Sequence, residues 1–533
     1  MSVVSLRRLS ESKPHGQFPT ALTRTLGVTP RRRQVGWRPR KTQRKELIVR
    51  SHDLWIDGAA ALSDAGNRIE RCSPSTGKLL ASFTLGSCGD VDTAVMAARR
   101  SFEAATWRGL PGSERAKAMN KWAELLQRNC EALSLIEADE VGKPIAASRA
   151  EIEYGIDLVR YAASLAWSIQ GRILSDEGAD KLGIILHEPR GVVGIITPWN
   201  YPVVCLMMKL PYALAAGCSV VVKPSEFTSG TTLEIARLAS ESGIPEGVFN
   251  VVTGTGAEVG EAISGHPGVD MVSFTGSSAV GKRIAQRASD TTKRVSLELG
   301  GKSANIVFAD ADIDEALEGT LQAFTINQGE ECCAGSRLLI ERSIADEFLT
   351  RLAERASKIR VGDPRDPATE MGPLIHEAHL ERVLGYIEKG KAEGAKTIAG
   401  GRRLSGTPYD KGFFVPPTIF TGVTTNMSIF KEEIFGPVVS AVAFDSLDEA
   451  VDIANSTTYG LAGGVWTQNF DKALSVVRRV RTGMMYINCY LQTIAQLPFG
   501  GMKESGFGRE NGIEGLMEFL EVRAAFAKLK TQF

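Results

Sequence analysis

The chain has 533 residues, more than one hydrophobic core normally serves, so we expect two or three domains. No apolar run approaches the roughly 18 residues that cross a bilayer, which excludes an integral membrane protein. Residues 1–50 hold 13 Lys and Arg against 2 Asp and Glu, leaving 49 basic and 60 acidic residues in the remainder. This mildly acidic remainder excludes nucleic acid as its partner.

The cysteines and histidines indicate the cellular compartment of the protein and whether it binds a metal. Eight cysteines without a CxxC pair or a secretory signal predict reduced thiols inside the cell, and we expect a cytoplasmic protein. Six scattered histidines offer no set of metal ligands, so we expect no metal. His376 and His379 fall in a polar helical stretch, which predicts a solvated face.

Residues 1–46 are rich in Arg and Ser and poor in acids, which predicts a disordered basic arm. An upstream extension outside the functional protein is our preferred interpretation. A mitochondrial presequence, which would change the compartment to the matrix, and a nucleic-acid or membrane-surface arm are the alternatives.

From Leu54 onward the pattern predicts short strands around Gly58 and at Leu79–Phe83, followed by helices. Those helices are expected at Ala94–Ala105, Ala116–Ala138 and Ala147–Ile169. The alternating segment Arg172–Pro189, with a turn at residues 176–178, predicts a hairpin. Exposed strands need partners, so this hairpin and residues 518–529 are the candidate oligomer contact.

Strands then alternate with helices, which predicts a parallel sheet covered on both faces. The expected strands are Val192–Thr197, Ser219–Lys223, Val248–Thr253 and Met271–Phe274, and the helices are Lys209–Ala216, Thr231–Ser242, Glu258–Ser264 and Ala279–Ala288. Ligands of such sheets lie at the carboxyl ends of the strands. The loops there carry Thr197, Pro198, Trp199, Asn200, Lys223, Ser225, Glu226, Gly256, Gly276 and Ser277.

Two of these loops indicate a dinucleotide. The turn from Gly276 to Gly281 would open a helix whose free N–H groups favour a phosphate, although it lacks the GxGxxG spacing and a plain turn is an equal alternative. Glu226 can accept hydrogen bonds from both ribose hydroxyls and would repel a 2′-phosphate, which favours NAD over NADP.

A second pattern of strands and helices runs from Asn305 to about Tyr486 and contains the segment Gly329-Glu330-Glu331-Cys332-Cys333. A cysteine attacks as its thiolate, so a site that uses one must lower its pKa or supply a base. By itself an intracellular Cys-Cys pair is more often packing than chemistry.

Other motifs give the pair its context. They are residues 197–202 (TPWNYP), 297–303 (LELGGKS), 432–437 (EEIFGP) and 498–506 (PFGGMKESG). Together with the cysteine segment, these residues resemble the aldehyde dehydrogenase superfamily, and the resemblance runs from about Leu54 to the C-terminus. It implies an α/β fold with two Rossmann-like parallel-sheet domains and a small β oligomerisation element.

The resemblance also implies domain boundaries and an assembly. We expect an NAD-binding domain at 47–170 and 190–299, a catalytic domain at 300–510 and an oligomerisation element at 171–189 and 511–533. A homodimer or homotetramer is the expected assembly. The active site then lies between the two larger domains.

The same resemblance assigns roles to residues. Cys332 is the implied nucleophile, since the family pattern places it three residues after Gly329, and the Asn200 amide with the Cys332 N–H stabilises the oxyanion. Glu298, 34 residues before Cys332, is the implied general base for hydrolysis. Glu433 and Phe435 match residues that hold the nicotinamide.

The implied substrate tunnel is lined by Tyr201, Cys205, Met208, Thr325, Ile326, Glu331, Phe499 and the loop Tyr490–Leu497. Met208 and Thr325 stand where betaine aldehyde oxidisers carry Trp, so we expect no tight aromatic cage. Aliphatic or aromatic aldehydes fit such a tunnel, and an amino-aldehyde fits if Glu331 faces inward.

The chain departs from the family at Glu330, where Gln is usual, and Glu331 precedes the thiol. Two extra carboxylates would raise the pKa of Cys332 if they face it. Cys333 is expected to be a small packing residue or a partner for reversible oxidation.

We therefore expect NAD-dependent oxidation of an aldehyde to a carboxylic acid through a thioester that water hydrolyses. A coenzyme A-acylating semialdehyde dehydrogenase is the enzyme alternative, and Glu298 counts against it. A non-catalytic binding or structural protein on the same fold is the second alternative, which would require none of Asn200, Glu298, Cys332 and Glu433.

Overall fold

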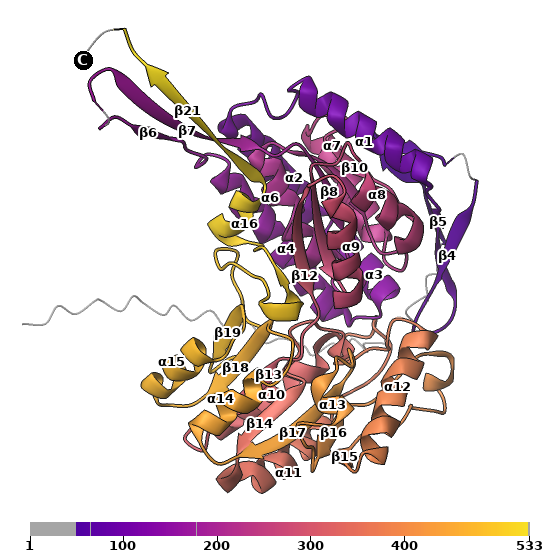
Figure 1. Cartoon of the computed structure of the whole chain (residues 1–533). Coiled ribbons are helices and arrows are strands. Elements are labelled where there is room, and N and C mark those ends of the chain that lie inside the picture. The colour runs from indigo at the N-terminus through magenta and orange to yellow at the C-terminus, as the bar shows by residue number, and fades with distance from the viewer. Residues whose placement is uncertain (1–48, 64–65, 177, 531–533) are drawn as a thin grey trace, which may run out of the picture. The chain divides into compact units, whose positions relative to one another are not determined.

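A computed structural model describes residues 49–63, 66–176 and 178–530 (Figure 1). They belong to one unit that runs from Ile48 to Phe533. The expected basic arm at 1–46 lies outside the described residues. No helix among the described residues is long and apolar enough to cross a membrane.

An eight-stranded sheet forms the first half of the fold. Its order is β20 (Gly506–Phe507), β12 (Arg294–Leu299), β11 (Met271–Gly276), β8 (Val192–Ile196), β9 (Ser219–Lys223), β10 (Phe249–Val251), β2 (Leu54–Ile56) and β3 (Ala59–Ala61). The five strands from β12 to β10 are parallel, and antiparallel strands close both edges. β8 and β9 are buried throughout, as expected of strands covered on both faces.

Helices cover this sheet. They are α1 (Cys88–Glu103), α2 (Gly112–Arg128), α3 (Cys130–Val141), α4 (Ile145–Leu165), α5 (Pro202–Met207), α6 (Leu210–Ala216), α7 (Gly230–Ser242), α8 (Glu261–Gly265) and α9 (Ser278–Ser289). The single helix expected at Ala116–Ala138 is wrong, because α2 ends at Arg128 and α3 begins at Cys130. Asn129 between them donates its side-chain amide to the Leu125 carbonyl, a local bond that competes with helix continuation.

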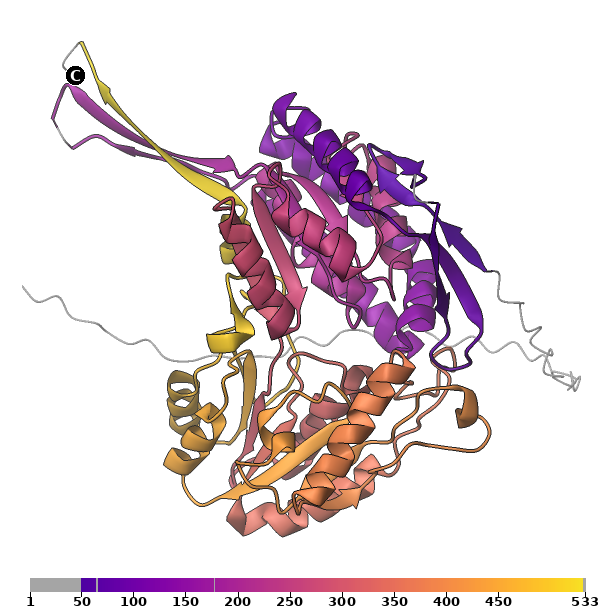
Figure 2. The same cartoon turned by 45° about the vertical axis from the view of Figure 1, so that its right-hand side comes forward.

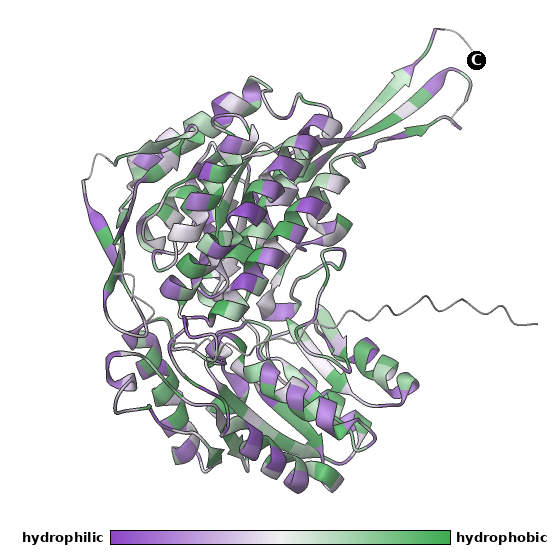
Figure 3. Cartoon of the chain, turned by 180° about the vertical axis from the view of Figure 1, so that it is seen from behind, coloured by the Kyte–Doolittle hydropathy of each residue, from purple (hydrophilic) through white to green (hydrophobic). Residues whose placement is uncertain are grey.

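A seven-stranded sheet forms the second half. Its order is β15 (Lys396–Ala399), β16 (Thr418–Thr421), β17 (Val438–Phe444), β14 (Arg337–Glu341), β13 (Ala304–Val307), β18 (Ala462–Trp466) and β19 (Met484–Ile487). All neighbours are parallel except β15. The main flanking helices are α10 (Ile313–Thr325), α11 (Ala345–Ala356), α12 (Glu377–Ala392), α13 (Ser428–Lys431), α14 (Leu447–Asn455) and α15 (Phe470–Arg479). In Figure 3 the strands of this sheet are mainly hydrophobic, whereas its helices carry both colours.

The expected hairpin is present as β6 (Arg172–Leu174) and β7 (Lys181–Pro189), which pair antiparallel. Its expected turn includes Glu177, which lies outside the described residues. After α16 (Gly512–Glu518), strand β21 (Leu520–Lys528) pairs with β7 along nine residues. Figures 1 and 2 show this three-stranded sheet extending away from the two larger sheets. A further small sheet contains β1 (Arg50–His52), β5 (Leu79–Thr84) and β4 (Arg68–Cys72).

Candidate active site

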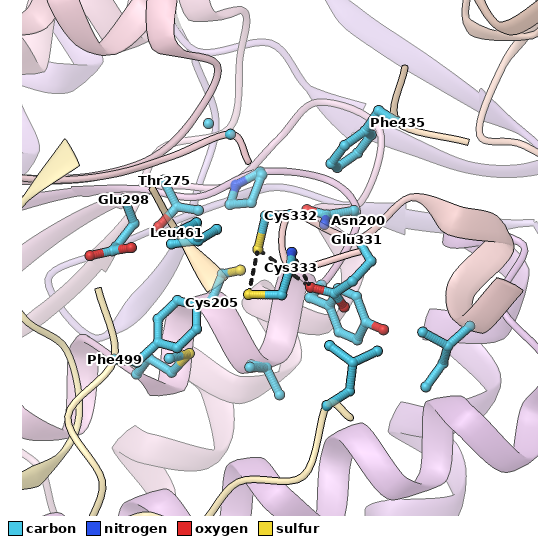
Figure 4. Close-up of a pocket in the computed structure, with 18 of the residues that line it drawn as sticks. Asn200, Cys205, Thr275, Glu298, Glu331, Cys332, Cys333, Phe435, Leu461 and Phe499 are labelled. Atoms are coloured by element: carbon cyan, nitrogen blue, oxygen red, sulfur yellow. Dashed lines mark hydrogen bonds between the residues drawn. The ribbon is translucent and has the colours of Figure 1, made fainter. Parts of the chain in front are cut away.

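A cavity of about 810 Å³ brings together residues from both larger sheets. Its walls contain Asn200, Glu298 and Cys332, which sequence reasoning had placed in one site (Figure 4). Asn200 follows β8, Glu298 lies in β12, and Cys332 follows α10 and a short 3-10 turn. The fold therefore brings into one pocket three residues that are up to 132 positions apart in the sequence.

The turn before Cys332 has an unusual backbone. Asn327, Gln328 and Gly329 all adopt positive φ angles of 47°, 57° and 69°. A Cβ on Gly329 would lie 2.3 Å from the Gly436 backbone, so only glycine fits there. Three left-handed residues in a row reverse the chain after α10 and aim the following cysteine into the cavity.

The Cys332 thiol has two close neighbours. Its Sγ lies 3.4 Å from Glu331 Oε1 and 4.0 Å from Cys333 Sγ. The hydrogen bond with Cys333, burial and the Glu331 charge raise the pKa of Cys332 well above its ordinary value. The thiol is therefore protonated at neutral pH in the free protein. Glu331 therefore raises the pKa of Cys332, as its sequence position had suggested, because its carboxylate faces the thiol.

Glu330 lies differently from Glu331. It is fully buried, its Oε1 accepts a hydrogen bond from the Ile375 amide at 2.9 Å, and it is not among the cavity-lining residues. Burial raises its pKa well above the ordinary value. Its backbone oxygen accepts the Asn200 amide at 2.9 Å. Since Asn200 Nδ2 carries two hydrogens, one remains for a ligand in the cavity.

Glu298 is 3% exposed, and neither carboxylate oxygen accepts a hydrogen bond of ordinary geometry from a described residue. Burial and the nearby Glu510 raise its pKa well above the ordinary value, against weaker opposing effects that include Lys209 and the Gly501 amide. Lys209 is paired with Glu510 and donates to Thr275 Oγ1 at 2.5 Å. Glu298 thus forms no ion pair among the described residues, although the Lys209 and Arg509 charges lower its pKa.

Six of the residues expected to bind the cofactor line the cavity. They are Pro198, Trp199, Gly276, Ser277, Glu433 and Phe435. Glu433 accepts the Gly301 amide at 2.9 Å, and burial raises its pKa to about 7. Ser277 caps α9, accepting from the Val280 amide, so the N-terminus of this helix faces the cavity region.

Five other expected cofactor residues do not line this cavity. They are Thr197, Lys223, Ser225, Glu226 and Gly256. Lys223 and Glu226 nevertheless leave β9 together as expected, with Nζ 3.2 Å from Oε2. These residues lie at or just beyond the carboxyl ends of β8, β9 and β10, where the ribose of a dinucleotide binds in such sheets. The donors and acceptors at these positions therefore fit NAD.

Six residues expected in the substrate tunnel also line the cavity: Tyr201, Cys205, Met208, Ile326, Glu331 and Phe499. The expectation for Thr325 is wrong, because it does not line the cavity and its hydroxyl donates to the Leu321 carbonyl, one turn back in α10. Of the loop expected at 490–497, only residues 491–493 line the cavity. Tyr490 packs behind it and donates to the Cys333 carbonyl at 3.0 Å.

Sequence reasoning missed several wall residues. The solvated face expected for His376 and His379 is wrong at His379, which is 7% exposed and lines the cavity. Burial lowers its pKa to about 4, and its Nε2 lies 2.7 Å from the Phe435 carbonyl, to which the neutral ring donates. Its ring also meets Trp199 edge-on at 5.3 Å. Thr275, Arg382 and Glu510 were missed as well.

Comparisons with known proteins identify the family of chains that this one resembles. The family model described as the aldehyde dehydrogenase family matches residues 61–525. A betaine aldehyde dehydrogenase of Bacillus subtilis is 42% identical, covering 90% of this chain and 98% of its own, and mouse "Aldehyde dehydrogenase, cytosolic 1" is 45% identical, covering 90% and 95%. An NAD-dependent aldehyde dehydrogenase structure from Sinorhizobium meliloti superposes with a TM-score of 0.90 at 44% identity, covering 92% and 97%. A betaine aldehyde dehydrogenase from Staphylococcus aureus in complex with NAD⁺ reaches 0.89 at 38% identity, again covering 92% and 97%.

Proposed function

Since the chain belongs to the aldehyde dehydrogenase family and is an enzyme that oxidises aldehydes with NAD, we propose that Cys332 is its nucleophile and Glu298 its general base. The observation that carries this proposal is a single cavity that holds the Cys332 thiol and the buried Glu298 carboxylate, which forms no ion pair among the described residues. The fold class and the cofactor expected from the sequence are confirmed.

The residues support the following steps. The Cys332 thiol releases its proton to solvent, and the thiolate attacks the aldehyde carbon. The Asn200 amide and the Cys332 N–H stabilise the resulting oxyanion. NAD supplies the hydride acceptor, and loss of hydride leaves a thioester on Cys332. Glu298 accepts a proton from water as that water attacks the thioester, releasing the carboxylic acid and the Cys332 thiolate. The carbonyl carbon is oxidised by two electrons.

Neither alternative function gains support. A coenzyme A-acylating enzyme needs no base for water, whereas Glu298 lies in the cavity with Cys332. A non-catalytic role does not apply to a chain that is an enzyme. In this proposal the NAD-binding domain is 47–170 with 190–299, the catalytic domain is 300–510, and residues 171–189 and 511–533 join subunits.

Replacing Cys332 by Ser tests the nucleophile. We expect kcat to fall about 10⁴-fold or more while NAD binding, measured by calorimetry, is retained. Cys489→Ser is the matched control, since Cys489 does not line the cavity, and it should keep full activity. Substantial activity in Cys332→Ser would move the nucleophile to Cys333.

The cavity walls favour a substrate class. Met208, Ile326 and Phe499 provide an apolar surface, and Glu331 adds one carboxylate beside the thiol. Aliphatic and aromatic aldehydes, and amino-aldehydes that pair with Glu331, fit this lining. NADH formation across these classes and betaine aldehyde would test it, and a preference for betaine aldehyde would contradict the absence of an aromatic cage.

The sheet of β6, β7 and β21 favours a homodimer or homotetramer. Ile173 and Phe526 on it are 67% and 68% exposed, an apolar surface that a monomer leaves in water. Light scattering of the wild type and of a Phe526→Ser variant would test this contact, and a monomeric wild type would contradict it. Eight free cysteines support the cytoplasm as the location.

A further inference from the structure

Three consecutive side chains at the nucleophile form a cluster that the catalytic steps do not require. Their ligand atoms are Glu331 Oε1, Cys332 Sγ and Cys333 Sγ, and all lie within 4.8 Å of one another. The Cys332 sulfur is 3.4 Å from the carboxylate oxygen and 4.0 Å from the Cys333 sulfur. Figure 4 shows the three groups beside one another in the cavity, with dashed lines joining them.

These separations fit a known coordination geometry. Tetrahedral Zn²⁺ with Zn–S bonds of about 2.3 Å holds two sulfurs roughly 3.8 Å apart, and a sulfur and a carboxylate oxygen roughly 3.5 Å apart. The two measured distances are within a few tenths of an ångström of these values. Small adjustments of side-chain torsions would complete a three-ligand site.

We propose that Glu331, Cys332 and Cys333 bind a thiophilic divalent cation, for which Zn²⁺ is the natural choice, and that the bound ion blocks the nucleophile. Thiolates favour Zn²⁺ over Mg²⁺ and Ca²⁺, which prefer oxygen. All three residues line the cavity, so the ion has a path in and a fourth position open to water. This site departs from the expectation, based on histidines, that no metal binds.

The surroundings already hold one ligand in place. The Cys333 backbone amide donates to Glu331 Oε1 at 3.0 Å, which orients the carboxylate toward the sulfurs. Because the ligands are adjacent in sequence, binding orders no additional loop. On binding, two S–H protons leave to solvent and two Zn–S bonds form, with no change in oxidation state.

Inhibition by the ion rests on the proposed role of Cys332, whereas binding does not. A zinc-bound Cys332 sulfur has its nucleophilic electron pair engaged by the metal and cannot attack an aldehyde. The two consequences can therefore be measured separately.

Zinc titration of the metal-free, full-length enzyme against a chromogenic chelator tests the binding. We expect one Zn²⁺ per chain and an affinity at least about tenfold weaker in Cys332→Ala, Cys333→Ala and Glu331→Gln. Cys489→Ser is the control and should bind as the wild type does, because Cys489 lies outside the cavity. Wild-type affinity in the three ligand variants would overturn the proposal.

X-ray absorption of the zinc-loaded wild type provides a test that needs no variant. We expect two sulfur neighbours at about 2.3 Å together with oxygen at about 2.0–2.2 Å. A shell of oxygen and nitrogen alone would overturn the site.

Aldehyde oxidation and alkylation of Cys332 by iodoacetamide, followed over the same zinc range, separate the two proposals. Loss of both in step with binding is the expected result. Binding with the expected ligands but undiminished oxidation would leave the metal site standing and refute Cys332 as the nucleophile.

Discussion

Two groups of buried charges contribute residues to the wall of the same cavity, and they differ in how their carboxylates are paired. In the first, the Lys143 ammonium contacts Glu137, at 3.1 Å, and Glu151, and all three side chains are almost fully buried. Burial opposes the charge on Lys143, but Glu151 and Glu137 raise its pKa above the ordinary value. In the second, Lys209 pairs with Glu510, and Glu298 forms no ion pair in the described part of the chain, although the Lys209 and Arg509 charges lower its pKa.

The difference shows how one protein separates structure from reactivity. A buried carboxylate that is paired contributes to architecture, since breaking the pair leaves a charge in a medium that solvates it poorly. A buried carboxylate that forms no ion pair and lines the cavity with the Cys332 thiol is placed to accept a proton from water. The Lys143 group should therefore govern stability, and Glu298 should govern rate.

The largest effect should come from Glu298→Gln. We expect kcat to fall about 10²- to 10⁴-fold, because water then lacks its base, while the free energy of unfolding stays the same or rises. Rapid-mixing measurements should show hydride transfer slowed less than thioester hydrolysis, as a retained burst of NADH. An unchanged steady-state rate would contradict the proposal that Glu298 governs rate.

Lys143→Met should act on stability. Removal of the ammonium leaves two buried carboxylates unpaired, and we expect the free energy of unfolding to fall by about 3–5 kcal/mol. Denaturant unfolding measures this loss. The matched control, Lys143→Met with Glu137→Gln and Glu151→Gln, should recover part of it, and a neutral single variant would mean that the pairing does not stabilise the fold.

The pH profile should separate the groups further. The pKa values of Glu298 and Cys332 are both raised, and each acts in its deprotonated form, so kcat/KM should rise with pH. Below the lower of these pKa values the increase should reach about a hundredfold per pH unit, and between the two values about tenfold per pH unit. Steady-state assays across the range measure this slope. A rate that is flat through neutral pH would mean that neither group limits the reaction.

Glu330→Gln should have the smallest effect. The raised folded-state pKa of Glu330 means that its stabilising contribution is complete below the unfolded value of 4.5 and is lost as pH rises through the folded value. Gln does not titrate, so the variant should gain about 1 kcal/mol or more over the wild type at alkaline pH and nothing at acid pH. Thermal unfolding of both proteins across this range measures the difference, and an equal difference at every pH would contradict it.

The sequence was sufficient to predict the elements and site residues that are marked by a local sequence pattern. Strands β8 and β9 are short runs rich in β-branched residues, and Glu298 and Cys332 stand in motifs with a fixed separation, so they could be found by pattern. The pattern could not separate α2 from α3, because the break depends on one Asn side chain.

Other features depend on contacts between distant segments. Lys209 meets Glu510 across 301 residues, and neither position carries a periodic or motif signal. His379 lies near the start of α12 and is buried where its ring packs against Trp199 and Phe435, two residues that are distant in sequence. Thr325 was misplaced because the side chain of a helical residue can bond back to its own helix, an orientation that sequence spacing does not reveal.

The short strand β20 has a consequence for the order in which the enzyme matures. Gly506 and Phe507 pair with Glu298 and Leu297 on β12, and Glu510 follows closely in the chain. A ribosome must therefore synthesise nearly the whole polypeptide before the surroundings of Glu298 exist. A nascent chain that has emerged through Cys332 already carries the thiol but not the completed pocket around the base, so hydrolytic turnover begins only after the C-terminal segment has folded back.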